Sequence, residues 1–247
     1  MENILKENER IDDLEFKNLK IIQNPKGFCF GIDSILLADF AKDIKSGSKV
    51  VDLGTGTGIL GILLCGKTDL GTVLGVEIQE EVADMARRSI ILNNLEKRFT
   101  ILNTDVKKLK SKVKLNNYDV VITNPPYKKL NTGKINESEK KLISRHEITA
   151  NLSDFIKTSY SLLKDNGVLY MVHRAERLAD IMYELRASKM EPKIIRFVYS
   201  NEIDDSKLVL IKAVKNAKTF LKIDKPLYIY DKKGNYTQEV LKIYNKK

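Results

Sequence analysis

The chain has 247 residues, which is enough for one large domain with a well-buried core. Its composition, 43% hydrophobic and 31% charged, is typical of a globular protein, and it contains no run of about eighteen apolar residues that would indicate a membrane span. The N-terminus lacks the layout of a signal peptide, and the two cysteines lie far apart, so we expect a cytoplasmic protein without metal or membrane partners. The net charge of +10 gives slight support to a polyanionic partner, because lysine-rich surfaces are often only solvated.

Seven short apolar runs between residues 49 and 214 read as β-strands, and helical patterns separate most of them. This alternation predicts an α/β fold in which a mostly parallel sheet has helices on both faces. Residues 200–206 alone join the last two runs, which is too short for a crossover, so these two strands should pair antiparallel. The predicted strands cover residues 49–53, 72–77, 99–102, 118–123, 167–172, 194–199 and 207–212.

Helical patterns lie around these strands, and one polar segment shows no pattern at all. Asp33 is placed to cap a helix from Ser34 to Lys42. The segment 128–144 is rich in lysine and has no apolar period, and we interpret it as a loop. Further helices are predicted over residues 80–93, 152–164 and 174–189.

The chain shows no clear domain boundary, so we expect a single domain made of three consecutive segments. Residues 1–48 precede the first strand as a cap segment, and residues 49–214 form the core. Residues 215–247 form a C-terminal extension that we expect to pack on the core. Within it, the segment 225–244 is typical of a β-hairpin with its turn at residues 232–235.

A glycine-rich turn, Asp52–Gly58, follows the first strand and precedes a helical run. Its G-x-G-x-G spacing differs from that of dinucleotide sites and of phosphate-binding loops. Tight turns need glycine in any case, so the acid that ends the next strand adds weight. Glu77 is placed to accept hydrogen bonds from both hydroxyls of a ribose, and a solvated strand end is the less favoured alternative. Asp105, after the third strand, suits an adenine amine of a cofactor and a helix cap equally well.

The segment Asn124–Tyr127, with the sequence Asn-Pro-Pro-Tyr, directly follows the fourth strand. An amine conjugated to a ring is a poor nucleophile, and two acceptors for its N–H groups favour the pyramidal form that attacks a methyl group. The Asn124 amide oxygen and the Pro125 carbonyl are such acceptors, and the prolines stiffen the loop around them. Tyr127 offers a face for stacking a flat base or amide. Alone, the tetrapeptide is also compatible with an ordinary proline turn.

Together these motifs resemble the class I methyltransferases that carry an N-P-P-Y motif. The resemblance implies a Rossmann-like, three-layer sandwich with a seven-stranded sheet of order 3-2-1-4-5-7-6 whose last strand is antiparallel. It also implies S-adenosylmethionine as the cofactor and no metal. The resemblance implies that the target amine is bound by Asn124, Pro125 and Tyr127, and that the cofactor is bound by Asp52, Gly54, Gly56, Glu77 and Asp105, with Asn124 beside it.

Within that superfamily the chain resembles the bacterial tRNA(Val) adenine-N6 methyltransferases, which modify the adenine next to the anticodon, at position 37. This resemblance rests on three segments: the N-terminal segment Gln23–Ala38, the segment Ser144–Glu147, and the C-terminal residues Pro226–Tyr230 with Asn235–Thr237. It implies a tRNA-processing, RNA-binding enzyme, and we expect a monomer.

Residues near these motifs have two interpretations each. Asp33 suits the methionine end of the cofactor, although a helix cap is the favoured role. His146 is interpreted as a structural or RNA-facing residue, and Phe28 and Phe30 as core residues that are also placed to flank a base. Hypothetical phosphate contacts are Lys128, Lys129, Lys134, Lys140, Lys141 and Arg145.

Other functions compete with this interpretation. A glutamine side chain is the substrate of release-factor methyltransferases with the same motif, but those normally carry an N-terminal helical domain, and only residues 1–48 precede the first strand here. A base amine in ribosomal RNA is harder to exclude as the substrate, and a DNA adenine is less favoured. A silent RNA-binding module and a dehydrogenase are the remaining classes, and the complete motifs disfavour both.

Overall fold

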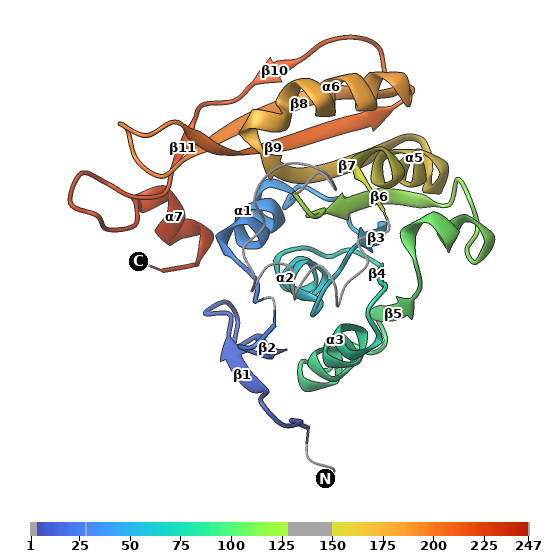
Figure 1. The fold of residues 1–247 in the computed structure, drawn as a ribbon, viewed down its shortest axis with the longest axis vertical. Coiled ribbons are helices and arrows are strands. Elements are labelled where there is room, and N and C mark those ends of the chain that lie inside the picture. Colours follow the sequence, from blue (N-terminus) through green and yellow to red (C-terminus); the bar gives the residue numbers. More distant parts are fainter. Residues whose placement is uncertain (1–3, 28, 128–149, 247) are drawn as a thin grey trace.

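The computed structural model describes residues 4–27, 29–127 and 150–246. Within them a twisted nine-stranded sheet runs through the molecule in the order β10-β8-β9-β7-β6-β3-β4-β5, and β11 pairs with β8 (Figure 1). Its strands are β3 (Lys49–Leu53), β4 (Thr72–Glu77), β5 (Phe99–Asn103), β6 (Tyr118–Thr123), β7 (Leu163–Arg174), β8 (Met190–Tyr199), β9 (Ser206–Lys215), β10 (Lys222–Ile223) and β11 (Leu227–Tyr228).

The predicted α/β fold is confirmed. Strands β3 to β7 pair in parallel, whereas β9 lies antiparallel between β7 and β8, as the short linker 200–206 required. Counted along the chain from β3, the seven main strands have the order 3-2-1-4-5-7-6, and β10 and β11 add two short parallel pairings beyond the expected seven.

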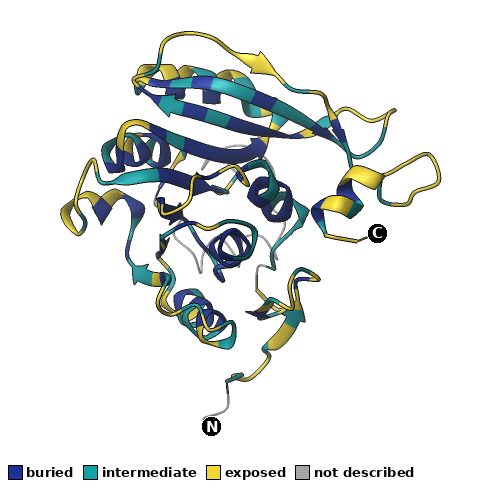
Figure 2. Ribbon diagram, turned by 180° about the vertical axis from the view of Figure 1, so that it is seen from behind, coloured by how far each residue is buried: buried dark blue, intermediate teal, exposed yellow. Residues whose placement is uncertain are grey.

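Helices cover both faces of the sheet and make three layers. One apolar cluster lies between the sheet and the α1–α2 side, and another lies between the sheet and the α5–α6 side (Figure 1). Adjacent strand residues alternate between the layers: Val50 belongs to the first cluster and Val51 to the second. Figure 2 shows the resulting buried centre. The helices are α1 (Ile32–Phe40), α2 (Ile59–Lys67), α3 (Glu80–Leu92), α5 (Leu152–Leu162), α6 (Leu178–Ala187) and α7 (Gln238–Ile243), with short 3-10 turns at Val106–Ser111 and Ala175–Arg177.

Two predicted helices begin differently from expectation. Helix α1 begins at Ile32 after Gly31, so Asp33 lies in its first turn and is not the cap; the cap interpretation was wrong. The predicted helix over 174–189 is shorter, because β7 extends through Arg174 and a 3-10 turn precedes α6. Pairing with β9 extends β7 at this end, since Arg174 is in register with Leu208.

The C-terminal extension confirms the predicted turn but not the predicted second strand. The Asp231 carboxylate accepts backbone hydrogen bonds from Lys233 and Asn235, and Gly234 has a φ of +81°. After it comes helix α7, which Thr237 caps by accepting from the Val240 N–H group. The second arm is helical because this cap precedes apolar residues at helical spacing, and Val240 and Ile243 are buried against the α1 side of the core.

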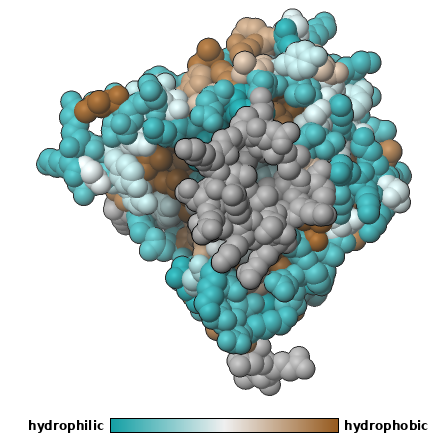
Figure 3. All heavy atoms as spheres, viewed as in Figure 1, coloured by the Kyte–Doolittle hydropathy of each residue, from teal (hydrophilic) through white to brown (hydrophobic). Residues whose placement is uncertain are grey.

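Exposed apolar residues gather at the β10 edge of the sheet. Phe220 is 71% exposed and Ile223 64% exposed, and the brown area at the top of Figure 3 lies where Figure 1 places β10. The rest of the visible described surface is mainly hydrophilic (Figure 3). No helix in the described ranges is both long and apolar enough to cross a membrane.

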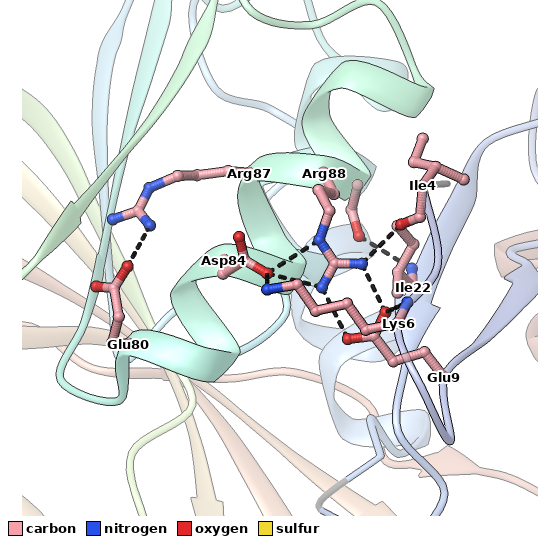
Figure 4. A network of polar contacts seen from close by, with 9 residues as sticks. Ile4, Lys6, Glu9, Ile22, Glu80, Asp84, Arg87 and Arg88 are labelled. Carbon is pink, nitrogen blue, oxygen red and sulfur yellow. Dashed lines mark hydrogen bonds and ion pairs between the residues drawn. The ribbon is translucent and has the colours of Figure 1, made fainter. Parts of the chain in front are cut away.

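The N-terminal hairpin, β1 (Arg10–Asp13) and β2 (Lys20–Gln23), is fastened to α3 by a polar network centred on Arg88 (Figure 4). The Arg88 guanidinium donates to both carboxylate oxygens of Glu9, at 2.6 and 2.7 Å, and to Asp84 at 3.0 Å. It also donates to the Ile4 carbonyl. A bidentate arginine–carboxylate pair fixes the orientation of the two groups as well as their positions, so the network determines where the hairpin lies.

We predict that Arg88→Met lowers the free energy of unfolding by about 2 kcal/mol, because Glu9 then loses a charged hydrogen-bond partner while only 7% exposed. Arg87→Met is the matched control, since Arg87 pairs with the exposed Glu80 and should change stability by less than about 0.5 kcal/mol. Urea unfolding measures both variants. Equal effects would contradict the anchoring role.

The same contact has a definite pH dependence. The hydrogen bond from Arg88 holds the pKa of Glu9 below its ordinary value of 4.5. Stabilisation from this group is therefore complete above pH 4.5 and is lost as the pH falls through the lower pKa of the folded state. The difference between wild type and Arg88→Met should shrink in that acidic range.

Candidate active site

The glycine turn after β3 contains three residues with positive φ angles. Gly54, Gly56 and Gly58 have φ values of +71°, +57° and +91°, which side chains larger than hydrogen rarely allow. A β-carbon at Gly56 would meet no atom within 4 Å, so open space lies above this part of the turn. The turn therefore offers bare backbone to a ligand.

Glu77, at the end of β4, lies against this turn. Its Oε2 accepts a hydrogen bond from the Gly56 N–H group at 3.1 Å, and its Oε1 accepts from Gln79 at 2.9 Å. The side chain is 6% exposed, so the solvated strand end considered for Glu77 is not what the structure has. Because each carboxylate oxygen can accept more than one hydrogen bond, Glu77 suits a sugar diol beside the glycine turn.

Asp52 lies beneath the turn and is fully buried. Its Oδ2 accepts from the Thr55 hydroxyl at 2.5 Å, whereas Oδ1 has no hydrogen-bond partner among the described residues. Burial raises the pKa of Asp52 to about 7, against a lowering by the Thr55 hydrogen bond and with a further rise from the Glu77 charge. Asp52 therefore holds the turn from below through Thr55.

Asp105 follows β5 and caps the 3-10 turn that begins at Val106. Its Oδ1 accepts from the Lys107 N–H group at 2.8 Å. This is one of the two roles that the sequence left open. Since a carboxylate has a second oxygen, the cap is compatible with an additional contact to a cofactor, and that contact stays a prediction.

The Asn-Pro-Pro-Tyr segment leaves the end of β6 beside the glycine turn. The Thr123 hydroxyl donates to the Leu53 carbonyl at 2.8 Å, which joins the ends of β6 and β3. Tyr127 turns back toward α1, where its hydroxyl lies 2.6 Å from Asp33 Oδ2 and 2.7 Å from Asn124 Oδ1. Burial, followed by the Asp33 charge, strongly raises the pKa of Tyr127, so its hydroxyl keeps its proton.

Two residues at the end of β7 were missed by the sequence reasoning. The His173 ring lies 5.1 Å from the Tyr127 ring between centroids, and the exposed Arg174 guanidinium lies 5.5 Å from the Tyr127 ring centroid. Burial lowers the pKa of His173 to about 4, so the imidazole is neutral, and its Nδ1 accepts from the Arg174 N–H group. Their position directly after a predicted strand was a usable signal, since ligands bind at the carboxyl ends of parallel strands.

Several predicted residues lie outside the described residues: Phe28, His146 and the basic residues between 128 and 145. Phe30 packs against the core cluster on the α1 side, which agrees with its favoured interpretation. Within the described ranges, no group of three or more His, Cys, Asp or Glu side chains is placed to hold a metal ion.

A family model described as "Methyltransferase small domain" matches residues 18–188, well over half of the chain. The chain belongs to this methyltransferase family. Its methyl donor is S-adenosylmethionine. The site fits this cofactor, because an open glycine turn and a carboxylate able to bind a ribose lie side by side at the strand ends.

Curated relatives and solved structures agree with this assignment. A protein of Dyadobacter fermentans named tRNA1(Val) (adenine(37)-N6)-methyltransferase is 24% identical over 226 residues, covering 89% of each chain. A Shewanella oneidensis release factor glutamine methyltransferase is 28% identical over 199 residues, covering 77% of this chain and 65% of that one. A structure described as a predicted O-methyltransferase from Agrobacterium tumefaciens is 22% identical with a TM-score of 0.70, covering 86% of this chain and 95% of its own, which shows the shared fold.

The buried carboxyl group of Asp52 predicts an unusual pH dependence of stability. Between pH 3.8 and about 7 the unfolded chain releases the Asp52 proton while the folded protein keeps it, so rising pH favours unfolding. Each unit of pKa is worth about 1.4 kcal/mol. Asp52→Asn should therefore become more stable relative to wild type between pH 5 and pH 8, measured by urea unfolding. The exposed Asp69→Asn control should show no such trend, and a flat difference for Asp52→Asn would contradict the assignment.

Proposed function

We propose that this methyltransferase modifies the exocyclic N6 amine of an adenine in tRNA, the adenine at position 37 of tRNA(Val) being the foremost candidate. The observation that carries the proposal is the Asn124–Tyr127 segment at the end of β6, directly beside the glycine turn and Glu77. A donor and an acceptor of a methyl group bound at these adjacent strand ends would meet over a short distance.

Three residues of the segment have a role in this proposal. The Asn124 amide oxygen and the Pro125 carbonyl accept hydrogen bonds from the two N–H groups of the target amine, which favours the pyramidal nitrogen. The Tyr127 ring stacks on the flat base. S-adenosylmethionine supplies an electrophilic methyl group. No strong base is required, and His173 is only a weak one, because burial lowers its pKa to about 4.

Support for RNA as the substrate comes from charge and from relatives. The chain carries a net charge of +10, and the exposed Arg174 lies beside the Tyr127 ring without an ion pair among the described residues. Porphyromonas gingivalis has a protein named tRNA1(Val) (adenine(37)-N6)-methyltransferase that is 28% identical over 175 residues, covering 69% of this chain and 68% of that one. A protein glutamine is the second candidate, because the S. oneidensis relative is named for that reaction. We further propose a cytoplasmic enzyme that acts as a monomer.

The deciding experiment is methyl transfer from labelled S-adenosylmethionine to separate pools of tRNA, ribosomal RNA, DNA and protein, followed by nucleoside or amino-acid analysis. We expect N6-methyladenosine in tRNA. Asn124→Ala should reduce transfer by about a hundredfold or more while folding is preserved, because one of two preorganised acceptors is lost. Label in protein would favour the glutamine reaction, and full activity of Asn124→Ala would contradict the role of the segment.

Arg174 gives a separate test of the RNA substrate. We predict that Arg174→Gln weakens tRNA binding and lowers the salt slope of the binding constant by about one, as loss of one phosphate contact would. Arg186→Gln is the control. Arg186 lies just before the start of β8, and Met190 at that start pairs with Lys215 at the end of β9, whereas Arg174 pairs with Leu208 near the start of β9. A slope that is unchanged by Arg174→Gln, measured by fluorescence anisotropy, would remove Arg174 from the RNA surface.

A further inference from the structure

The hydroxyl of Tyr127 has one proton and two close acceptors. Its oxygen lies 2.6 Å from Asp33 Oδ2 and 2.7 Å from Asn124 Oδ1. Both distances are those of short hydrogen bonds, but a single proton can be donated in only one direction at a time. The other oxygen would then face the tyrosine oxygen with lone pairs opposed.

The proton should go to Asp33. A carboxylate is a stronger acceptor than a neutral amide oxygen, and bonds between a hydroxyl and a carboxylate are typically the shorter ones. The hydroxyl does keep a proton to give, because burial of Tyr127 holds its pKa far above the ordinary range. The oxygen of Tyr127 is then left as an acceptor toward Asn124.

The direction of the Tyr127 proton affects the orientation of the Asn124 amide. The oxygen and nitrogen ends of an amide are alike in shape, so the surrounding hydrogen bonds decide which end faces which neighbour. With its proton committed to Asp33, Tyr127 favours the NH₂ end of Asn124. The amide oxygen then lies toward the Ser34 hydroxyl, which the structure has 3.4 Å from Asn124 Nδ2, and it is not consumed by Tyr127.

We propose that Asp33 is a positioning residue that takes the Tyr127 proton and so keeps the Asn124 amide oxygen available to accept a hydrogen bond from the target amine. The inference rests on the proposed role of Asn124 in binding that amine. Asp33 touches neither the amine nor the methyl group in this scheme; it acts through Tyr127.

The local structure is shaped to hold the Asp33 carboxylate at this place. Asp33 lies in the first turn of α1, 94 residues from Tyr127, and does not cap the helix. A β-carbon on residue 31 would collide with Asp33 Oδ1. Gly31 has a φ of −106°, so its backbone conformation does not require glycine, whereas a side chain there would push the Asp33 carboxylate from its place.

Two variants disturb Asp33 in different ways. Asp33→Asn keeps the shape and removes the charge, so Tyr127 no longer has a preferred acceptor. Gly31→Ala keeps the charge and displaces the carboxylate. We expect both to lower the rate of methyl transfer at saturating substrates by about tenfold or more, with the dissociation constant of S-adenosylmethionine changed by less than about twofold. Asp43→Asn, an exposed change just after α1, should behave as wild type.

A double-mutant cycle separates this coupling from a general loss of structure. Tyr127→Phe removes the hydroxyl, so adding Asp33→Asn to Tyr127→Phe should change the rate by less than about twofold. Full additivity would overturn the proposal. So would weaker cofactor binding by Asp33→Asn at an unchanged rate, which would assign Asp33 to the cofactor.

A measurement without substrate tests the orientation of the Asn124 amide separately from the proposed function. In ¹⁵N-labelled protein, the Asn124 side-chain NH₂ signal, assigned by its loss in Asn124→Ala, should show a strong NOE to the Tyr127 ring protons that weakens in Asp33→Asn. Absence of that NOE in wild type would overturn the inference. Absence of methyl transfer to tRNA by wild type would instead count against the proposed substrate.

Discussion

Parallel pairing of β3 with β4 on one side and β6 on the other is the constraint on which the site depends. Leu53 at the end of β3 is in register with Val76 on β4 and with Thr123 on β6. Since parallel strands end at the same edge, the glycine turn, Glu77 and Asn124 are adjacent although they are far apart in sequence. A slip of one residue would exchange Val50 and Val51 between two packed layers, so the buried faces fix this register.

Charge is divided across the strand ends. The Glu77 carboxylate lies at the cofactor turn, next to the buried Asp52, whose pKa burial raises to about 7, while an exposed cation, Arg174, lies on the side of Tyr127. A positively charged sulfonium suits the first group and a nucleic acid phosphate suits the second. The two ligands of the proposed reaction would therefore be separated by electrostatics as well as by shape.

Both ends of the described chain support the helices beside the site. Arg88 fastens the N-terminal hairpin to α3, and α7 packs against the cluster that contains α1. Lys67 adds a polar link between α2 and these parts, since its ammonium donates to the Ile243 carbonyl at 2.9 Å and to Asp39 of α1 at 3.4 Å. The α7 residues in this cluster and the bond from Lys67 to Asp39 support α1, the helix that carries Asp33.

The sequence determined the α/β class and the motif residues at the ends of β3, β4 and β6, because short-range periodicity and strand-end motifs are local properties. The strand order was expected from the resemblance alone. Sequence reasoning assigned Asp33 to a helix cap and missed His173 and Arg174. It also predicted a strand where α7 forms. Only the tertiary structure brings Asp33 within 2.6 Å of the Tyr127 hydroxyl. No local pattern encodes a contact across 94 residues, since it depends on how α1 packs against the sheet and on the direction in which the chain leaves β6.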